Sequence, residues 1–197
     1  MRRSAFRSGI ALISLLGALW GGPSALAEVA CGGVKLPESV EAFGKKLVLN
    51  GAGVRRATFL NVHVYVAGLY LEQPTRDLAQ ILALSRTKEI TLHFVRDVSR
   101  KEMLDAIREG IENNAGPKKA SAEKHLLSFE RYLPDLKSGT RLTLAYQPQR
   151  GLEVRQNGTV IGSEKDDEFA NLLFHVWLGP KPPDADLKAG LLGRKCS

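Results

Sequence analysis

Residues 47–72 read LVLNGAGVRRATFLNVHVYVAGLYLE and indicate how this chain folds. An apolar segment, Leu47 to Leu49, is followed by Asn50-Gly51-Ala52-Gly53, and two glycines this close together predict a bend that breaks the strand. Residues 57–72 are rich in Val, Leu and Tyr, and apolar valines alternate with other residues in part of this segment. This pattern predicts one or two β-strands directly after the bend.

The rest of the chain alternates between further strands and two blocks of helices. Two local signals are clear: Ser99 and Glu102 have the spacing of a capping box at a helix start, and Asn157-Gly158 suits a type I′ hairpin turn. The pattern predicts strands at 89–96, 142–146, 152–156 and 159–163, and helices at about 77–84, 99–114, 121–133, 166–178 and 184–192. An α+β fold is expected, in which a large antiparallel sheet packs against a layer of helices.

The N-terminal residues are typical of a signal peptide. Arginines within residues 2–7 precede an apolar segment at 9–20, and an Ala-x-Ala motif ends at Ala27. That apolar segment is too short for a membrane-spanning helix, which needs ~20 residues. We therefore expect residues 1–27 to be a signal peptide cleaved near Ala27. Residues 28–197 would then be a single domain in the periplasm or secreted, with no membrane span.

Charge and motifs exclude several functional classes. Removing residues 1–27 takes away three arginines and no acids, so the formal net charge falls from +7 to +4, and no Lys/Arg run exceeds two residues. Nucleic-acid binding is therefore not expected. The four histidines lack metal-ligand spacing, no G-x-S-x-G motif is present, and the G-x-G at 51–53 is not followed by a helix. We expect no metal and no cofactor.

The two cysteines, Cys31 and Cys196, lie near opposite ends of the mature chain. In an oxidising compartment such an even pair can form a disulfide that closes a very long loop. Two free thiols at frayed termini are the alternative, because the sequence does not place their Cα atoms.

The segment Asn50 to Arg55, followed by Val64 to Glu72, resembles the start of chalcone isomerase and its non-plant relatives, with a G-A-G-x-R turn and then an apolar strand ending G-x-Y-L-E. The similarity covers most of residues 34–193, and the leader suggests an exported bacterial branch of the chalcone isomerase-like family. It implies an open-faced β-sandwich, a large antiparallel sheet packed against a layer of helices.

The resemblance also implies candidate site residues. Chalcone isomerases close a ring on their substrate by orientation and oxyanion stabilisation, and their turn arginine maps onto Arg55. Their strand threonine aligns with Tyr65. Their helical tyrosine, lysine and asparagine fall near Met103, Ala106 and Gly110, and their last threonine falls near Val176, so most of the catalytic groups are replaced.

We expect a periplasmic protein that binds a fatty acid or a similar amphipathic anion without catalysis, and two alternatives remain open. Another branch of the superfamily binds fatty acids, gripping the carboxylate with the arginine and a tyrosine on the next strand, and Arg55 with Tyr65 fits that pattern. An intramolecular lyase acting on a conjugated substrate would instead use Arg55 as its electrostatic residue. A structural module with a filled core is the third possibility.

Several observations on individual residues separate these functions. A structural module would leave Arg55 to pair with Asp97 or Glu72, and Tyr65 as an ordinary strand aromatic. A cavity running from Arg55 between the sheet and the helices would favour the binder or the enzyme over the structural module. A second polar cluster pointing at that cavity would favour the enzyme, and the residues that could supply one are Lys101, Asn113 and Asn114. Phe174 and Trp177 are expected to pack in the core.

Overall fold

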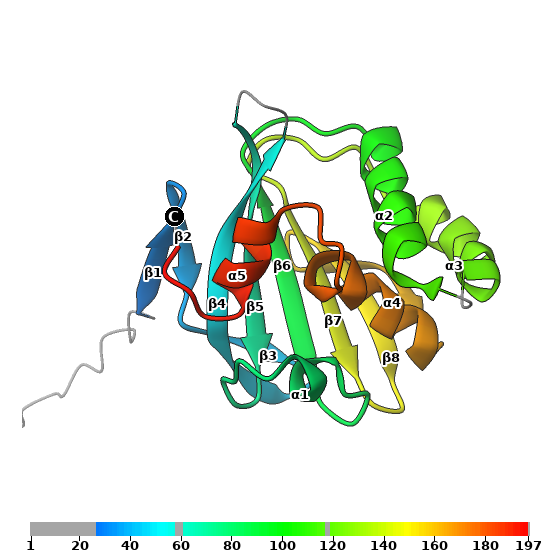
Figure 1. Ribbon diagram of the computed structural model, residues 1–197, viewed down its shortest axis with the longest axis horizontal. Helices are drawn as coiled ribbons and strands as arrows, with labels where there is room; N and C mark the ends of the chain where they lie inside the picture. The colour runs from blue at the N-terminus through cyan, green and yellow to red at the C-terminus, as the bar shows by residue number, and fades with distance from the viewer. Residues whose placement is uncertain (1–26, 58–60, 117–118, 197) are drawn as a thin grey trace, which may run out of the picture.

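A curled antiparallel sheet of seven strands forms the frame of the structure. The computed structural model describes residues 27–57, 61–116 and 119–196. The strands of this sheet are β3 (Ser39–Ala42), β4 (Lys45–Ala57), β5 (Val62–Leu71), β6 (Lys88–Phe94), β7 (Arg141–Gln147), β8 (Gly151–Gln156) and β9 (Thr159–Glu164). Each strand pairs with its neighbours in the sequence, in the order β3 to β9, so the sheet needs no crossover connection (Figure 1).

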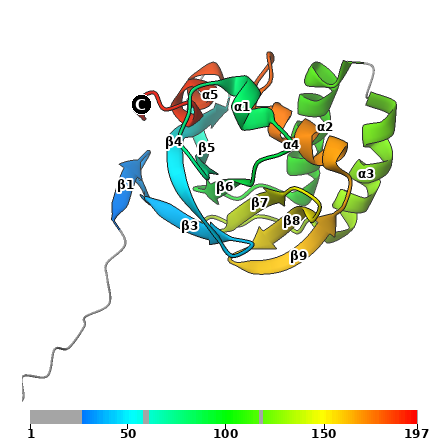
Figure 2. The ribbon, with the colours of Figure 1, turned by 90° about the horizontal axis from the view of Figure 1, so that it is seen from below.

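Helices cover one face of this sheet (Figures 1 and 2). They are α1 (Leu78–Leu82), α2 (Arg100–Asn114), α3 (Lys119–Tyr132), α4 (Asp167–Leu178) and α5 (Ala185–Leu191). Helix α4 is apolar along most of its length and eight of its 12 residues are buried, so it lies within the core. The α+β prediction, a large antiparallel sheet packed with helices, is confirmed.

The two local signals also act as predicted. Ser99 caps α2: its Oγ accepts a hydrogen bond from the Glu102 amide, and the Glu102 carboxylate accepts one from the Ser99 amide at 2.8 Å. Asn157 and Gly158 have φ angles of 51° and 89°, as the turn between β8 and β9 requires. Both residues tolerate this left-handed region of the backbone, which most side chains avoid.

The prediction that Asn50 to Gly53 ends the strand is wrong, because β4 runs through these residues; the local irregularity there is a register shift between Leu49 and Gly51. The glycines serve close packing instead. A Cβ on Gly51 would lie 2.2 Å from the carbonyl oxygen of Gly190, and one on Gly53 would lie 2.8 Å from that of Leu187. Helix α5 therefore lies directly on the backbone of β4.

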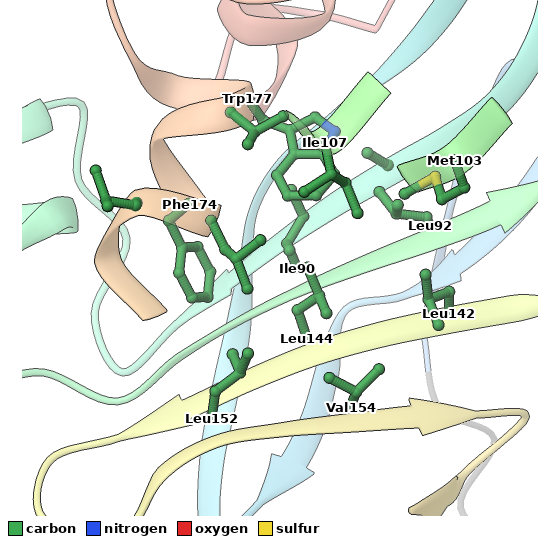
Figure 3. Close-up of a cluster of buried hydrophobic side chains, with 14 of the residues drawn as sticks. Ile90, Leu92, Met103, Ile107, Leu142, Leu144, Leu152, Val154, Phe174 and Trp177 are labelled. Carbon is green, nitrogen blue, oxygen red and sulfur yellow. The ribbon is translucent and has the colours of Figure 1, made fainter. Parts of the chain in front are cut away.

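The core fills the space between the sheet and the helices. Figure 3 shows Met103 and Ile107 of α2 and Phe174 and Trp177 of α4 packed above the sheet. The sheet contributes apolar side chains from its middle strands, among them Ile90, Leu92, Leu142, Leu144, Leu152 and Val154. Strand β5 is buried on both faces, since Val66 packs in a second cluster on the far side of the sheet. This explains why its sequence is almost continuously apolar.

A small hairpin, which the sequence analysis did not predict, lies beside β4. Strands β1 (Glu28–Cys31) and β2 (Val34–Pro37) form it, and the C-terminus lies next to it (Figure 1). Cys31 and Cys196 form a disulfide there, with their Cα atoms 5.6 Å apart. The predicted signal peptide falls almost wholly on residues 1–26, outside the described part of the chain. Within the described part, no helix has the length and hydrophobicity to cross a membrane.

Candidate functional site

A cavity of about 340 Å³ lies between the sheet and helices α2 and α4. Its floor is apolar and almost fully buried, and includes Phe94, Met103, Ile107, Val176 and Trp177. Polar side chains also line it, namely Arg55, Tyr65, Arg96, Glu102, Glu109, Asn113 and Lys181. An apolar floor with a few polar groups that point into the cavity is typical of small-molecule binding sites.

Arg55 reaches this cavity because of its register in the sheet. It pairs with Tyr65 across β4 and β5, so both side chains lie on the helix-covered face. Its Nη1 donates a hydrogen bond to the carbonyl oxygen of Arg56. The two acids considered as its partners are engaged elsewhere, Glu72 with Lys45 and Asp97 with Lys137.

Across the described ranges, no carboxylate forms an ion pair with Arg55. The guanidinium is therefore available to an anion in the cavity. Helix α5 supports this position of Arg55. The N-cap residue of α5 is Asp184, and its carboxylate accepts a hydrogen bond from the Arg56 amide at 3.1 Å. Helix α5 thus fixes the end of β4 where Arg55 points inward.

Tyr65 is held by Trp177. The indole Nε1–H of Trp177 donates to the Tyr65 hydroxyl at 2.9 Å, and both residues are buried. Burial raises the pKa of Tyr65 to about 12, against the opposing effects of the Trp177 hydrogen bond and the charge of Arg55. The group is thus a neutral phenol at physiological pH. Because its oxygen already accepts from the indole, its own O–H is left to donate.

The positions implied by the family resemblance also line this cavity. Met103, Ala106, Gly110 and Val176 all line it, and each is apolar where the resemblance implies a polar group. Helices α2 and α4 touch here, since a Cβ on Gly110 would lie 2.6 Å from a methyl group of Val176. A larger polar side chain at position 110 would not fit between the helices.

Of the residues considered for a second polar cluster, only Asn113 lines the cavity. Lys101 pairs with Asp105 on the outside of α2. The Asn114 side chain donates to the backbone oxygen of Lys181 at 3.0 Å and accepts from its amide at 2.9 Å. It therefore holds the Pro-rich segment 180–183 against α2, where this segment forms part of the cavity wall.

Sequence reasoning missed several lining residues. Trp177 was expected only to pack, whereas it also orients Tyr65; Phe174 packs in the core as expected. Arg96 was not considered, although it lies two residues beyond Phe94 and alternation along an extended chain could have placed both on one face. Its Nη1 donates to the Asp97 carbonyl at 2.8 Å, and its buried Nε has no hydrogen-bond partner among the described residues.

Two acidic residues of α2 also line the cavity, and the sequence did not predict either of them. The carboxylate of Glu102 is committed to the helix cap, where hydrogen bonds from Ser99 lower its pKa. Glu109 lies two turns further along and is exposed at the rim. As for metals, the described ranges hold no cluster of three or more His, Cys, Asp or Glu side chains able to bind an ion.

With this geometry established, comparison with known proteins identifies the class. The chalcone isomerase-like family model matches residues 28–193, and the chain belongs to this family. Among solved structures it is similar to a fatty-acid binding protein of Arabidopsis thaliana, at 18% sequence identity and a TM-score of 0.71, over 84% of this chain and 96% of that one. No curated protein matches the sequence. A likeness at this identity supports the fold.

Proposed function

We propose that this protein binds a fatty acid or a similar amphipathic carboxylate, without catalysis, after export from the cytoplasm. The observation that carries the proposal is the Arg55–Tyr65 pair, which faces a cavity with an apolar floor from adjacent strands. The similarity to a fatty-acid binding protein agrees with it.

The chemistry of the pair suits a carboxylate. A guanidinium without a carboxylate partner in the described structure offers parallel N–H donors that match the two carboxylate oxygens. The Tyr65 O–H, oriented by Trp177, adds a neutral donor. The apolar floor would then take the hydrocarbon tail, at ~0.8 kcal/mol for each buried methylene.

The apolar replacements support a binding role rather than a catalytic one. Met103, Ala106 and Val176 lie where the resemblance implies groups that polarise or position the substrate. These apolar side chains can contact a hydrocarbon tail, but they offer no hydrogen bond to a reacting ketone.

Export is supported by the leader pattern and by the disulfide. A bond between Cys31 and Cys196 persists in oxidising compartments and is rare in a reducing cytosol. N-terminal sequencing of the protein recovered from the periplasm or the medium tests this part. A mature chain beginning near Glu28 is expected, whereas an intact leader on cytoplasmic protein would contradict export.

The binding proposal is tested by native mass spectrometry and calorimetry, with decanoate as the probe. Wild type is expected to bind it. Arg55→Ala removes charge-assisted hydrogen bonds of about 1.5–3 kcal/mol each, so its affinity is expected to fall at least tenfold. Tyr65→Phe removes a neutral donor, so a loss of severalfold is expected.

Arg56→Ala is the matched control, since Arg56 is the next residue on β4 and does not line the cavity. It is expected to bind as wild type does. Equal affinities for wild type and Arg55→Ala would contradict the assignment of Arg55. No binding by wild type would contradict the function.

An intramolecular lyase is the second candidate, and one observation favours it. Glu109 and Asn113 lie on the cavity-facing side of α2, so polar groups are present beyond Arg55. Loss of absorbance from a hydroxylated chalcone, measured with wild type and with Arg55→Ala, tests this function. Turnover by wild type that Arg55→Ala lacks would favour the enzyme over the binder.

A further inference from the structure

We infer that Asp184 and the Cys31–Cys196 disulfide together position Arg55, so that the protein binds its carboxylate ligand more tightly when oxidised than when reduced. This inference rests on the proposed function and concerns its regulation. Three features carry it: an irregularity of β4 at Arg55, a carboxylate that holds this irregularity, and the packing of β4 between two elements that the disulfide joins.

The direction of the Arg55 side chain depends on an irregularity in β4. The register between β4 and β5 shifts after Arg55, which lies opposite Tyr65, because the next residue, Arg56, lies opposite His63. Such β-bulges bend a strand and re-aim its side chains. The Arg55 guanidinium also donates a hydrogen bond to the Arg56 carbonyl oxygen. The position of the Arg56 backbone therefore sets where Arg55 points.

Asp184 holds that backbone with one oxygen of its carboxylate, Oδ2, which accepts a hydrogen bond from the Arg56 amide at 3.1 Å. The other oxygen, Oδ1, caps α5 by accepting from the amides of Asp186 and Leu187 at 2.9 and 3.0 Å. One side chain thus joins the helix to the irregularity of β4. Any opening of α5 removes the acceptor of the Arg56 amide.

Helix α5 keeps its place through tertiary contacts. It has seven residues, too few for a helix that is stable on its own. Leu187 and Leu191 are fully buried in the core, and the Asn50 side chain donates to the Leu191 carbonyl oxygen at 2.8 Å. The position of Asp184 consequently depends on how well the C-terminal segment, residues 184–196, stays docked on β4.

The opposite face of β4 packs against the hairpin of β1 and β2. Cys31 shares a buried cluster with Ala52 and Val54 of β4. A Cβ on Gly32 would lie 2.6 Å from a methyl carbon of Val54, the residue before Arg55. Alternation along the strand places these contacts on the face away from α5. Strand β4 therefore lies between the hairpin and α5 (Figure 1).

The disulfide joins these two elements. Cys31 is the last residue of β1, and Cys196 lies in the segment that follows α5. Chain termini fray unless they are tied down, and this bond ties the C-terminal segment to the hairpin. Reduction gives the segment a free end, so α5 opens more often. Because only the docked form aims Arg55 into the cavity, apparent affinity falls with the docked fraction.

The coupling also acts in the opposite direction. A ligand that binds only the docked form stabilises that form, and the two effects are thermodynamically linked. Cys31 is 3% exposed, so reduction of its disulfide is expected to proceed through opening of the C-terminal segment. At a ligand concentration of 100 times Kd, bound ligand should slow the reduction by up to about a hundredfold.

The first test compares the decanoate affinities of oxidised and reduced wild type by calorimetry. Dithiothreitol supplies two electrons and two protons to Cys31 and Cys196, and is itself oxidised to a cyclic disulfide. Reduced protein is expected to bind severalfold more weakly, and Cys31→Ser/Cys196→Ser should match it without reductant. Equal affinities for oxidised and reduced wild type would overturn the inference.

Asp184→Asn tests the positioning role in fully oxidised protein. Asparagine is as good an N-cap as aspartate, but its single acceptor oxygen cannot serve both the cap and the Arg56 amide. Decanoate affinity is expected to fall severalfold while the urea midpoint changes little. The matched control is Asp77→Asn, since Asp77 caps α1 and does not line the cavity. Equal affinities for the two variants would contradict the role of Asp184.

The third test follows reduction of the disulfide by dithiothreitol with and without decanoate. The ligand should slow the reduction of wild type and leave that of Arg55→Ala unchanged, a result that a merely structural disulfide would not give. A rate in wild type that ignores bound decanoate would overturn the coupling and leave carboxylate binding intact. Failure of oxidised wild type to bind decanoate would instead overturn the proposed function, and this inference with it.

Discussion

Replacing Tyr65 by phenylalanine tests the hydrogen bond that orients the site. The substitution removes the oxygen that accepts from the Trp177 indole N–H at 2.9 Å. Trp177 is 1% exposed, so this donor would be left buried without a partner. Such a donor costs about 1–3 kcal/mol, and the free energy of unfolding of Tyr65→Phe is expected to fall by that amount.

The same strand supplies the matched control. Tyr70 is 1% exposed, and within the described chain its hydroxyl has no hydrogen-bond partner. Removing that hydroxyl leaves no partner unsatisfied and relieves a buried polar group. Tyr70→Phe is therefore expected to be neutral or slightly stabilising.

Urea unfolding at pH 7, followed by circular dichroism, measures both variants, and the double variant Tyr65→Phe/Trp177→Phe completes a thermodynamic cycle. The stability loss of the double variant should be smaller than the sum of the losses of Tyr65→Phe and Trp177→Phe. The reason is that Trp177→Phe removes the very donor that Tyr65→Phe leaves without a partner. Equal stabilities for Tyr65→Phe and Tyr70→Phe would refute the reasoning. A purely additive cycle would show that the two side chains do not interact.

Three further predictions concern stability. The Cys31–Cys196 bridge closes a loop with a sequence separation of 165 residues, so replacing both cysteines by alanine should lower the free energy of unfolding by about 5 kcal/mol in the chain-entropy model; a urea midpoint unchanged from oxidised wild type would contradict this. Lys88 is fully buried, and burial lowers its pKa to about 8. The unfolded chain keeps the Lys88 proton up to its ordinary pKa of 10.5, so the free energy of unfolding should rise between about pH 8 and 10.5. The variant Lys88→Met should lack that rise. Burial raises the pKa of Tyr65 to about 12, and of the other three tyrosines as well, so stability should fall as pH rises above 10, and native protein at pH 10 should show little phenolate absorbance; a normal tyrosine titration there would argue against the burial.

Local chemistry allowed much of the fold to be predicted. Ser99 with Glu102, and Asn157 with Gly158, specify a helix start and a hairpin through contacts between residues close in the sequence. The strand and helix segments followed from periodicity for the same reason. The G-A-G-x-R and G-x-Y-L-E motifs indicated the family, and with it the face-to-face arrangement of sheet and helices.

The same glycines show where local reasoning failed. Gly51 and Gly53 predicted a bend, because glycine is permissive in isolation. In the structure these two positions are glycines because α5, more than a hundred residues later in the chain, lies directly against them. Residues close in the sequence give no sign of that contact. The hairpin of β1 and β2 was also missed. Its two short strands pair with each other within residues 28–37, whereas the disulfide that fastens Cys31 to Cys196 joins opposite ends of the chain.

From the sequence, periodicity and turn chemistry specified the strand and helix segments, and the resemblance to the family made Arg55, in the turn, and Tyr65, on the strand after it, the candidate site residues. The folded structure was needed to show that both residues face a cavity and that Arg55 pairs with neither Asp97 nor Glu72. It was also needed to show that Trp177, 112 residues away from Tyr65, orients the Tyr65 hydroxyl. Those properties depend on strand register and on how α2, α4 and α5 dock on the sheet, which are fixed by packing between distant parts of the chain rather than by any local pattern.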